Sequence, residues 1–181
     1  MTTLAVPMTV EQFEEANFPE NYELHHGVPV AMTLPRFVHR SLQTQMQHLL
    51  KEAFPGSKVV VEMTFAVAGT DDERSADVGM TTRERGRLAI KSGALAGAPE
   101  LVVEVFFPSN TLRALKAFRR LCFDHGTLVF LTVDSEEQSV DVHVKGEKTA
   151  RTYTLGEEIP LNLWGQTKRI SVSAIFADDP L

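Results

Sequence analysis

The feature that most constrains the fold is a pair of apolar segments separated by one helix-forming stretch. Leu101–Phe107 is apolar on both faces apart from a single glutamate, and Thr127–Val133 is apolar as well. Strands of this kind are typical of the covered centre of a sheet. Between them, Pro108 ends the first strand and Ser109 can cap a helix that runs to about Phe123. This strand–helix–strand order predicts a parallel crossover.

The residues before the crossover predict helices and strands in alternation. Helices are expected from about residue 9 to 16, where Thr9 and Gln12 form a capping box, and from Pro35 to about Ala53. The other expected elements are a hairpin turning at His25, His26 and Gly27, strands over Lys58–Ala68 and Ser75–Met80, and a basic loop over Thr81–Gly97 with room for one helical turn.

The residues after the crossover change pattern. Val140–Val144 and Arg151–Leu155 alternate between apolar and polar residues, which predicts antiparallel edge strands with one wet face. A short helix over Val172–Phe176 closes the chain. The expected fold is of the α/β (α+β) class: a central mixed sheet flanked by helices, with antiparallel edge strands toward the C-terminus, in a single domain over residues 1–181.

Composition excludes several classes of protein. The 181 residues carry a net charge of −6, which excludes a wholly basic coat for nucleic acid but leaves room for a local basic patch. The single cysteine, Cys122, excludes an internal disulfide framework and a multi-cysteine zinc site, and it favours a reducing, cytoplasmic compartment. No apolar run approaches the roughly 20 residues of a membrane span, and the acidic start is unlike a signal peptide.

Three acidic residues lie in or beside strands whose neighbours are apolar. Glu104 interrupts the most apolar strand, Asp77 lies between Ala76 and Val78, and Glu23 precedes the predicted hairpin turn. A carboxylate in a covered strand costs several kcal/mol unless a cation or hydrogen bonds meet it. Converging carboxylates would hold a hard divalent cation, which could activate water beside a phosphate. The alternative for each is a solvated tip or a salt bridge to a nearby arginine or lysine.

The histidines and basic residues allow two interpretations. His39 lies on the long helix, where a histidine is more often structural than catalytic, and His25 and His26 are interpreted as turn residues. Two basic groups could meet phosphates or form solvated helix and loop surfaces; they are the stripe Arg113, Lys116 and Arg120, and the loop residues Arg83, Arg85, Arg87 and Lys91. Phosphate-binding glycine loops, a Gly-x-Ser-x-Gly elbow and a Cys-His nucleophile signature are absent from the sequence.

In these residues the sequence resembles the Uma-two family, restriction-endonuclease-like proteins of the PD-(D/E)xK nuclease superfamily. The resemblance runs from about Thr9 to Phe176. It rests on Tyr22-Glu23-Leu24 before a glycine turn, His39 early in the long helix, Arg74-Ser75-Ala76-Asp77-Val78, Gly97-Ala98-Pro99-Glu100-Leu101-Val102-Val103-Glu104-Val105, Pro108-Ser109 and the tail Arg169–Phe176.

The resemblance implies a restriction-endonuclease-like fold and Mg²⁺- or Mn²⁺-dependent hydrolysis of phosphodiester bonds, with DNA as the substrate. The family's acidic metal-binding positions fall on Glu23, Asp77 and Glu104, and its helical histidine falls on His39.

The sequence also departs from the family pattern. The proline before the aspartate is Ala76, and the lysine expected two residues after the acidic strand residue would be Phe106. The lysine that this family is expected to carry on the following helix falls on Phe118, which can neither orient water nor offset charge on a phosphate. Three further family positions, two acidic and one tyrosine, are here Val28, Ala114 and Cys122.

Three hypotheses follow. The first is a metal-dependent endonuclease that uses Glu23, His39, Asp77 and Glu104. The second is a nuclease fold without catalysis that acts as a binding or regulatory partner, because Phe118 replaces the lysine. The third is a homodimer in which the partner chain supplies the missing positive group.

Overall fold

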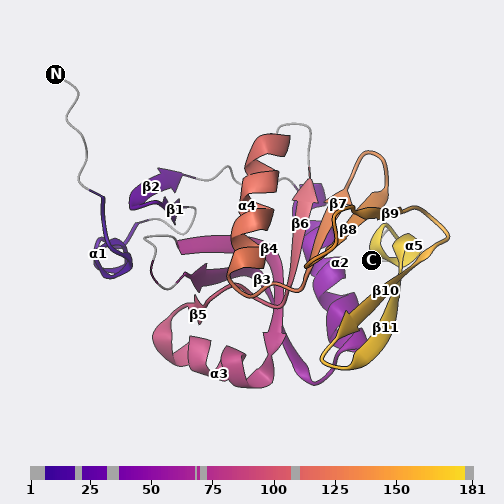
Figure 1. The fold of residues 1–181 in the computed structure, drawn as a ribbon, viewed down its shortest axis with the longest axis horizontal. Coiled ribbons are helices and arrows are strands. Elements are labelled where there is room, and N and C mark those ends of the chain that lie inside the picture. Colours follow the sequence, from indigo (N-terminus) through magenta and orange to yellow (C-terminus); the bar gives the residue numbers. More distant parts are fainter. Residues whose placement is uncertain are drawn as a thin grey trace.

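The molecule is built on a large mixed sheet with helices on both faces (Figure 1). The computed structural model describes residues 7–18, 22–31, 37–67, 69, 73–106 and 111–177. The helices are α1 (Val10–Glu15), α2 (Phe37–Ala53), α3 (Arg83–Ser92), α4 (Leu112–Asp124) and α5 (Val172–Ile175). The strands are β1 (Tyr22–His25), β2 (Val28–Ala31), β3 (Ser57–Ala66), β4 (Glu73–Thr82), β5 (Leu95–Ala96), β6 (Leu101–Phe106), β7 (Val129–Asp134), β8 (Ser139–Val144), β9 (Arg151–Tyr153), β10 (Glu158–Leu163) and β11 (Gln166–Ser171).

The predicted crossover lies at the centre of the sheet. Strands follow one another in the order β2, β1, β4, β6, β7, β8, β9, and β3 pairs with both β4 and β5. β6 and β7 are parallel with α4 between them in the chain, and Glu104 lies opposite Thr132. β8 and β9 continue the sheet in antiparallel pairing, as the alternating patterns predicted. The fold class and its central mixed sheet are therefore confirmed.

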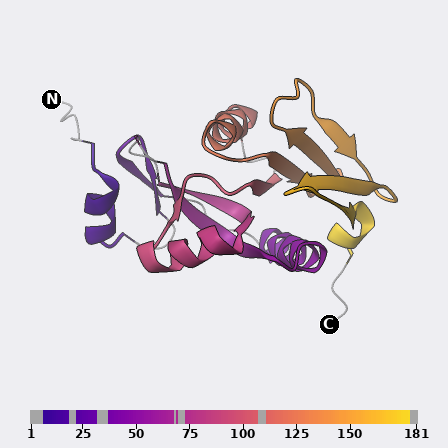
Figure 2. The ribbon, with the colours of Figure 1, turned by 60° about the horizontal axis from the view of Figure 1, so that its bottom comes forward.

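Two helices cover opposite faces of the sheet, α2 on one and α4 on the other (Figure 2). On the α2 face, Leu42, Met46 and Leu50 pack in one apolar core with alternate residues of β6 and β7. On the α4 face, Phe118 and Cys122 pack with Phe65, Val102 and Phe130. Because successive strand residues point to opposite faces, β6 contributes side chains to both cores, which explains why every residue in it except Glu104 is apolar.

The start of α4 differs from the prediction. The side chain of Thr111 accepts a hydrogen bond from the backbone N–H of Ala114, so Thr111 is the N-cap and the helix begins at Leu112. Ser109, the predicted cap, lies outside the described residues, as does Pro35, the predicted start of α2. The capping box of α1 is present as predicted, with Thr9 and Gln12 bonded reciprocally.

The expected loop over Thr81–Gly97 is wrong, because its one allowed helical turn is instead the ten-residue helix α3. Thr82 caps the helix by accepting a hydrogen bond from the Arg85 N–H, and Gly93 ends it with a positive φ of 88°. Arginine and lysine are good helix formers, so a basic composition does not indicate a loop. Arg85 then reaches back to the carbonyl oxygens of Ala96, Gly97 and Ala98 and ties the helix to the chain that enters β6.

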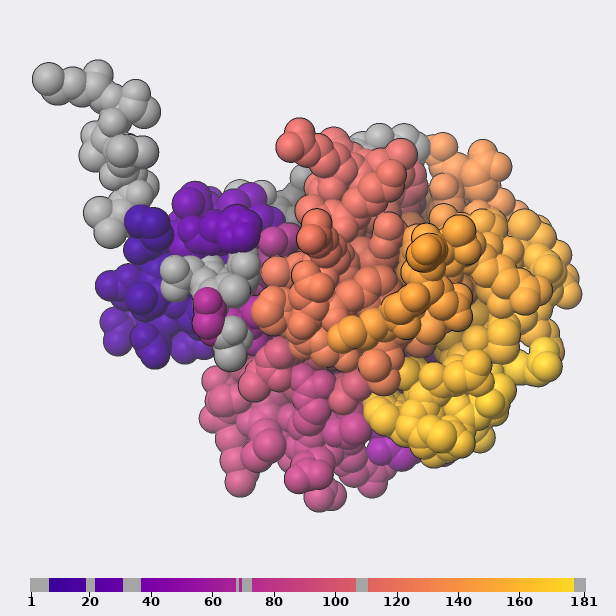
Figure 3. Space-filling view, in the orientation of Figure 1, coloured from indigo at the N-terminus to yellow at the C-terminus, as the bar shows by residue number. Residues whose placement is uncertain are grey.

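The strands β10 and β11 form a second, two-stranded sheet that was not predicted. Ile159, Leu161 and Leu163 are buried on one side of β10, and the hairpin turns at Trp164 and Gly165. In the space-filling view, α4 lies across the middle of the face, between the N-terminal elements and the C-terminal strands (Figure 3). Among the described residues, no helix is long and apolar enough to span a membrane.

Candidate active site

The site lies where two strands share one edge of β4 and leave a fork between them. β1 pairs with this edge at Glu73 only, opposite Leu24. β6 pairs with it from Val78 to Met80. For β4 residues 74–77, the described strands give no register partner on this edge, so the backbone N–H groups that point to it, those of Ser75 and Asp77, need other acceptors.

Carboxylates bridge this fork in place of backbone carbonyls. Glu23 Oε1 on β1 accepts a hydrogen bond from the Ser75 N–H at 3.3 Å. Glu104 Oε1 on β6 accepts one from the Asp77 N–H at 3.2 Å, and Asp77 Oδ2 accepts one from the Val105 N–H at 2.7 Å. Asp77 and Glu104 are therefore linked through each other's strands, and Glu23 contacts β4 two residues before Asp77, at Ser75.

Helix α2 supplies two more partners of Asp77. His39 Nε2 lies 3.1 Å from Asp77 Oδ2, and the Gln43 side-chain amide donates to Asp77 Oδ1 at 3.0 Å. The two residues share a helix face because they are four positions apart. His39 was predicted and Gln43 was not, although this spacing was a signal that could have identified it.

Burial and neighbouring charge act on Glu104. Desolvation raises the pKa of the Glu104 carboxyl well above its usual value, and the charge of Asp77 raises it further. The hydrogen bond from the Asp77 N–H and the positive charge of Arg74 oppose this rise in pKa. A cation between Asp77 and Glu104 would relieve the same repulsion.

Glu23 has partners of its own within the protein. Its Oε2 lies 2.7 Å from His25 Nε2 and 3.3 Å from Arg74 Nε. The interpretation of His25 as only a turn residue is therefore wrong, because it ends β1 and contacts a site carboxylate, whereas His26 lies in the turn with a φ of 50°. Arg74 belongs to the quoted motif, but its role was not recognised from the sequence.

Phe118 occupies the surroundings expected of an apolar core residue. Only 7% of it is exposed, and its ring lies 6.1 Å from the rings of both Phe65 and Phe130, centroid to centroid. The guanidinium carbon of Arg74 lies over the Phe118 ring, 5.1 Å from its centroid. A cation thus reaches this point from β4.

Other cations of α4 are directed elsewhere. Arg119 Nη1 lies 2.9 Å from His143 Nε2, and burial lowers the pKa of Arg119. Arg113, Lys116 and Arg120 are exposed, so a solvated helix face accounts for the basic stripe. Cys122 lies on the buried face of α4, where burial raises the pKa of its thiol.

The chain is similar to known proteins in sequence and in fold. A sequence model of the Uma-two family, described as "Putative restriction endonuclease", matches residues 9–168. The chain belongs to this family. A solved structure with the same fold is titled as a "putative nuclease belonging to DUF820" from Anabaena variabilis; it has a TM-score of 0.75 and 18% identity over 94% of this chain and 98% of that one. A search of curated proteins gave no match.

The carboxylates of this Uma-two chain offer a metal ion two ligands at the fork. Among the described residues, no three His, Cys, Asp or Glu side chains cluster as a metal-binding group. Asp77 and Glu104 form a pair, which is enough for Mg²⁺ because this ion is usually held by one or two carboxylates together with water and substrate phosphate. The repulsion that raises the pKa of Glu104 also fits a cation at this pair. That Glu23 is a third ligand stays a prediction.

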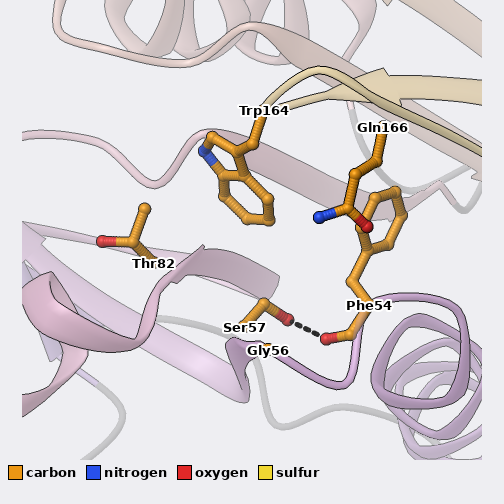
Figure 4. A pocket seen from close by; sticks show the side chains of 6 residues that line it. All are labelled: Phe54, Gly56, Ser57, Thr82, Trp164 and Gln166. Atoms are coloured by element: carbon orange, nitrogen blue, oxygen red, sulfur yellow. Dashed lines mark hydrogen bonds between the residues drawn. The ribbon is translucent and has the colours of Figure 1, made fainter.

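Two cavities lie outside the fork of this Uma-two protein. One of about 210 Å³ runs between α4 and the strands β6, β7 and β8 and is lined in part by Lys116, Thr132 and Asp141. The other, of about 190 Å³, lies between Trp164 on the β10–β11 turn and the end of α2 (Figure 4). In it, Trp164 meets Phe54 edge-to-face, and neither ring brings an ionisable group.

Proposed function

We propose that the protein is a metal-dependent nuclease that hydrolyses phosphodiester bonds in DNA. The observation that carries this proposal is the pairing of Asp77 and Glu104 across the fork, where each carboxylate is hydrogen-bonded to the other strand. Membership of the Uma-two family, whose description is that of a restriction endonuclease, supports the same activity.

Asp77 and Glu104 would hold Mg²⁺ or Mn²⁺, which when bound activates water and offsets charge on the phosphate. His39 and Gln43 fix the Asp77 carboxylate from the α2 face, and the backbone of Val105 fixes it from β6. Two strands and one helix therefore hold the carboxylate before substrate arrives. Such preorganisation is what a catalytic site requires.

The test incubates the protein with supercoiled plasmid and with single-stranded circular DNA in Mg²⁺ and in Mn²⁺. Asp77→Asn and Glu104→Gln each remove one negative charge and should lower cleavage at least about 100-fold. Asp124→Asn is the matched control, because this carboxylate lies exposed at the end of α4. An inactive wild-type protein, or cleavage unchanged in Asp77→Asn, would refute the proposal.

A second candidate is a nuclease fold that binds a partner without cleaving DNA. Both oxygens of Asp77 already accept hydrogen bonds from the protein, and Phe118 is apolar. This candidate predicts no Mn²⁺ binding by calorimetry. Tight Mn²⁺ binding that is lost together with turnover in Glu104→Gln would contradict it.

A further inference from the structure

Arg74 brings a positive charge to the fork from within the chain. It lies on β4, three residues before Asp77, and its Nε lies 3.3 Å from Glu23 Oε2. Its guanidinium covers the ring of Phe118. Only 17% of the Arg74 side chain is exposed, so its charge acts in surroundings that water screens poorly.

Glu23 and Phe118, which contact Arg74, are themselves fixed by other residues. Glu23 is fixed by the Ser75 N–H and by His25. The Phe118 ring is packed between two other aromatic rings of the α4 core. A planar guanidinium that stacks on a ring and meets a carboxylate at its edge has its plane and its direction set together.

The charge of Arg74 reaches the proposed metal pair. The ion-pair partner of Arg74, Glu23, accepts a hydrogen bond from the Ser75 N–H, two residues before Asp77, whose own N–H donates to Glu104. Other arginines around this face pair elsewhere: Arg119 with His143, Arg85 with Glu100 and Arg120 with Asp124.

We propose that Arg74 is the cation that binds the scissile phosphate, and that Glu23 and Phe118 are positioning residues for it. This inference rests on the proposed nuclease function. In hydrolysis the water oxygen forms a new bond to phosphorus, the P–O ester bond breaks, and the departing oxygen takes up a proton while the water loses one. Negative charge grows on the non-bridging oxygens, where a fixed guanidinium stabilises it. Arginine remains protonated, so Arg74 supplies charge and hydrogen bonds but does not accept the proton.

The positive group at the site could come from three places: Arg74 on β4, a lysine on α4, or a partner chain. A helical lysine would come from α4, and a partner chain would supply the group only in a dimer. Arg74 supplies it within one chain, so the rate per chain should not depend on protein concentration across the range in which sedimentation shows a change from monomer to dimer.

The experiment compares Arg74→Met with Arg169→Met, which removes the same charge from an exposed ion pair on β11. Arg74→Met should lower plasmid cleavage about 100-fold, the effect of losing one fixed donor to a developing oxyanion. Calorimetry should show Mn²⁺ affinity unchanged or tighter, because a nearby cation is removed. For a labelled single-stranded oligonucleotide in Ca²⁺, the slope of log affinity against log salt should fall by about 0.7, the value for one phosphate contact. Arg169→Met should change none of the three.

The outcomes separate this inference from the nuclease proposal. If the wild-type protein neither cleaves nor binds the oligonucleotide, the nuclease proposal fails and this inference fails with it. If the wild-type protein cleaves and Arg74→Met matches Arg169→Met in rate and salt slope, only the inference fails. If Arg74→Met does not unfold cooperatively on heating, Arg74→Lys replaces it. Lysine keeps the positive charge but cannot stack a planar group on the Phe118 ring. Cleavage by Arg74→Lys that is at least about tenfold slower, with unchanged Mn²⁺ affinity, supports positioning by Phe118. Cleavage at the wild-type rate overturns it.

Discussion

Replacing Phe118 by leucine and Arg74 by methionine, singly and together, measures how strongly the aromatic ring holds the guanidinium. Leucine keeps an apolar side chain in the α4 core while removing the ring, and methionine keeps the unbranched stem while removing the charge. Each single change also loses other contacts, such as the ion pair of Arg74 with Glu23. The double-mutant cycle cancels those losses and leaves the coupling free energy between the two side chains.

The structure sets the size of this coupling. Cation–π contacts are worth about 0.5–1 kcal/mol at exposed sites and about 2 kcal/mol when desolvated. The side chains of Arg74 and Phe118 are 17% and 7% exposed, which places the pair toward the desolvated limit, at about 1–2 kcal/mol. With a urea dependence of about 1–3 kcal/mol per molar, this coupling corresponds to a difference in unfolding midpoint on the order of 0.5 M.

The assay is equilibrium unfolding in urea followed by circular dichroism. Arg151 and Tyr153 provide the control cycle, since their separation of 4.7 Å is shorter than the 5.1 Å of the first pair but Arg151 is exposed. Burial predicts the larger coupling for Arg74 and Phe118, whereas distance alone predicts it for the control. A coupling below about 0.3 kcal/mol for Arg74 and Phe118, within the usual error of additivity, would refute the reasoning.

Further predictions concern the carboxylates and the backbone. Burial and the charge of Asp77 raise the pKa of Glu104 in the folded protein. Between the ordinary pKa of 4.5 and this raised value, the native state binds more protons than the unfolded chain. The metal-free protein should therefore lose stability as pH rises through the folded pKa. Glu104→Gln should flatten this loss in urea unfolding from about pH 5 to about pH 8, and an unchanged slope would contradict it. Asp77→Asn and Asp77→Ala both remove the negative charge, so calorimetry should detect no Mn²⁺ binding by either variant. Asparagine keeps an oxygen for the Val105 N–H and alanine does not, so the alanine variant should be about 1–3 kcal/mol less stable in thermal or urea unfolding. Equal stabilities would count against the fork. Gly97→Ala should cost about 1–2 kcal/mol, because Gly97 has a φ of 74° and a Cβ there would lie 3.1 Å from the His125 carbonyl oxygen. Gly146→Ala, with a similar φ but open space, should cost less, and equal costs in urea unfolding would show that strain and not contact decides.

The central crossover was predictable because burial on both faces leaves a clear mark in the sequence. β6 contributes to the α2 core and to the α4 core, so nearly every position in it must be apolar. The one exception, Glu104, stood out for that reason and led to the site. Where a segment meets only one core, the sequence is less decisive, and the ends of α4 could be predicted only approximately.

The two errors in secondary structure have different causes. The helix α3 exposes most of its surface, so its basic residues gave no apolar periodicity from which to recognise a helix. The β10–β11 hairpin did carry a signal, since Ile159, Leu161 and Leu163 alternate before a Trp–Gly turn. That alternation predicts a strand with one buried face, as β10 is.

The cation of the site could not be predicted because it depends on contacts between distant segments. Asp77 and Glu104 were found from their local surroundings, since each interrupts apolar neighbours. Arg74 follows a polar stretch, and only the folded chain places it over Phe118 and beside Glu23. A missing lysine on one helix therefore says little about the charge of a site, because another strand can bring a cation to the same point.

The fork explains why carboxylates stand here even before any catalytic role is considered. Where β1 and β6 diverge from β4, backbone N–H groups at Ser75 and Asp77 lose the carbonyls that a continuous ladder would offer, and Glu23 and Glu104 accept in their place. The same substitution gathers negative charge in a partly buried site, which costs free energy unless cations answer it. Arg74 forms an ion pair with Glu23, and a divalent ion would neutralise the charge of Asp77 and Glu104. The geometry that divides the sheet thus places carboxylates where a bound cation would stabilise them, so the side chains that complete the backbone hydrogen bonds are the ones proposed to hold metal.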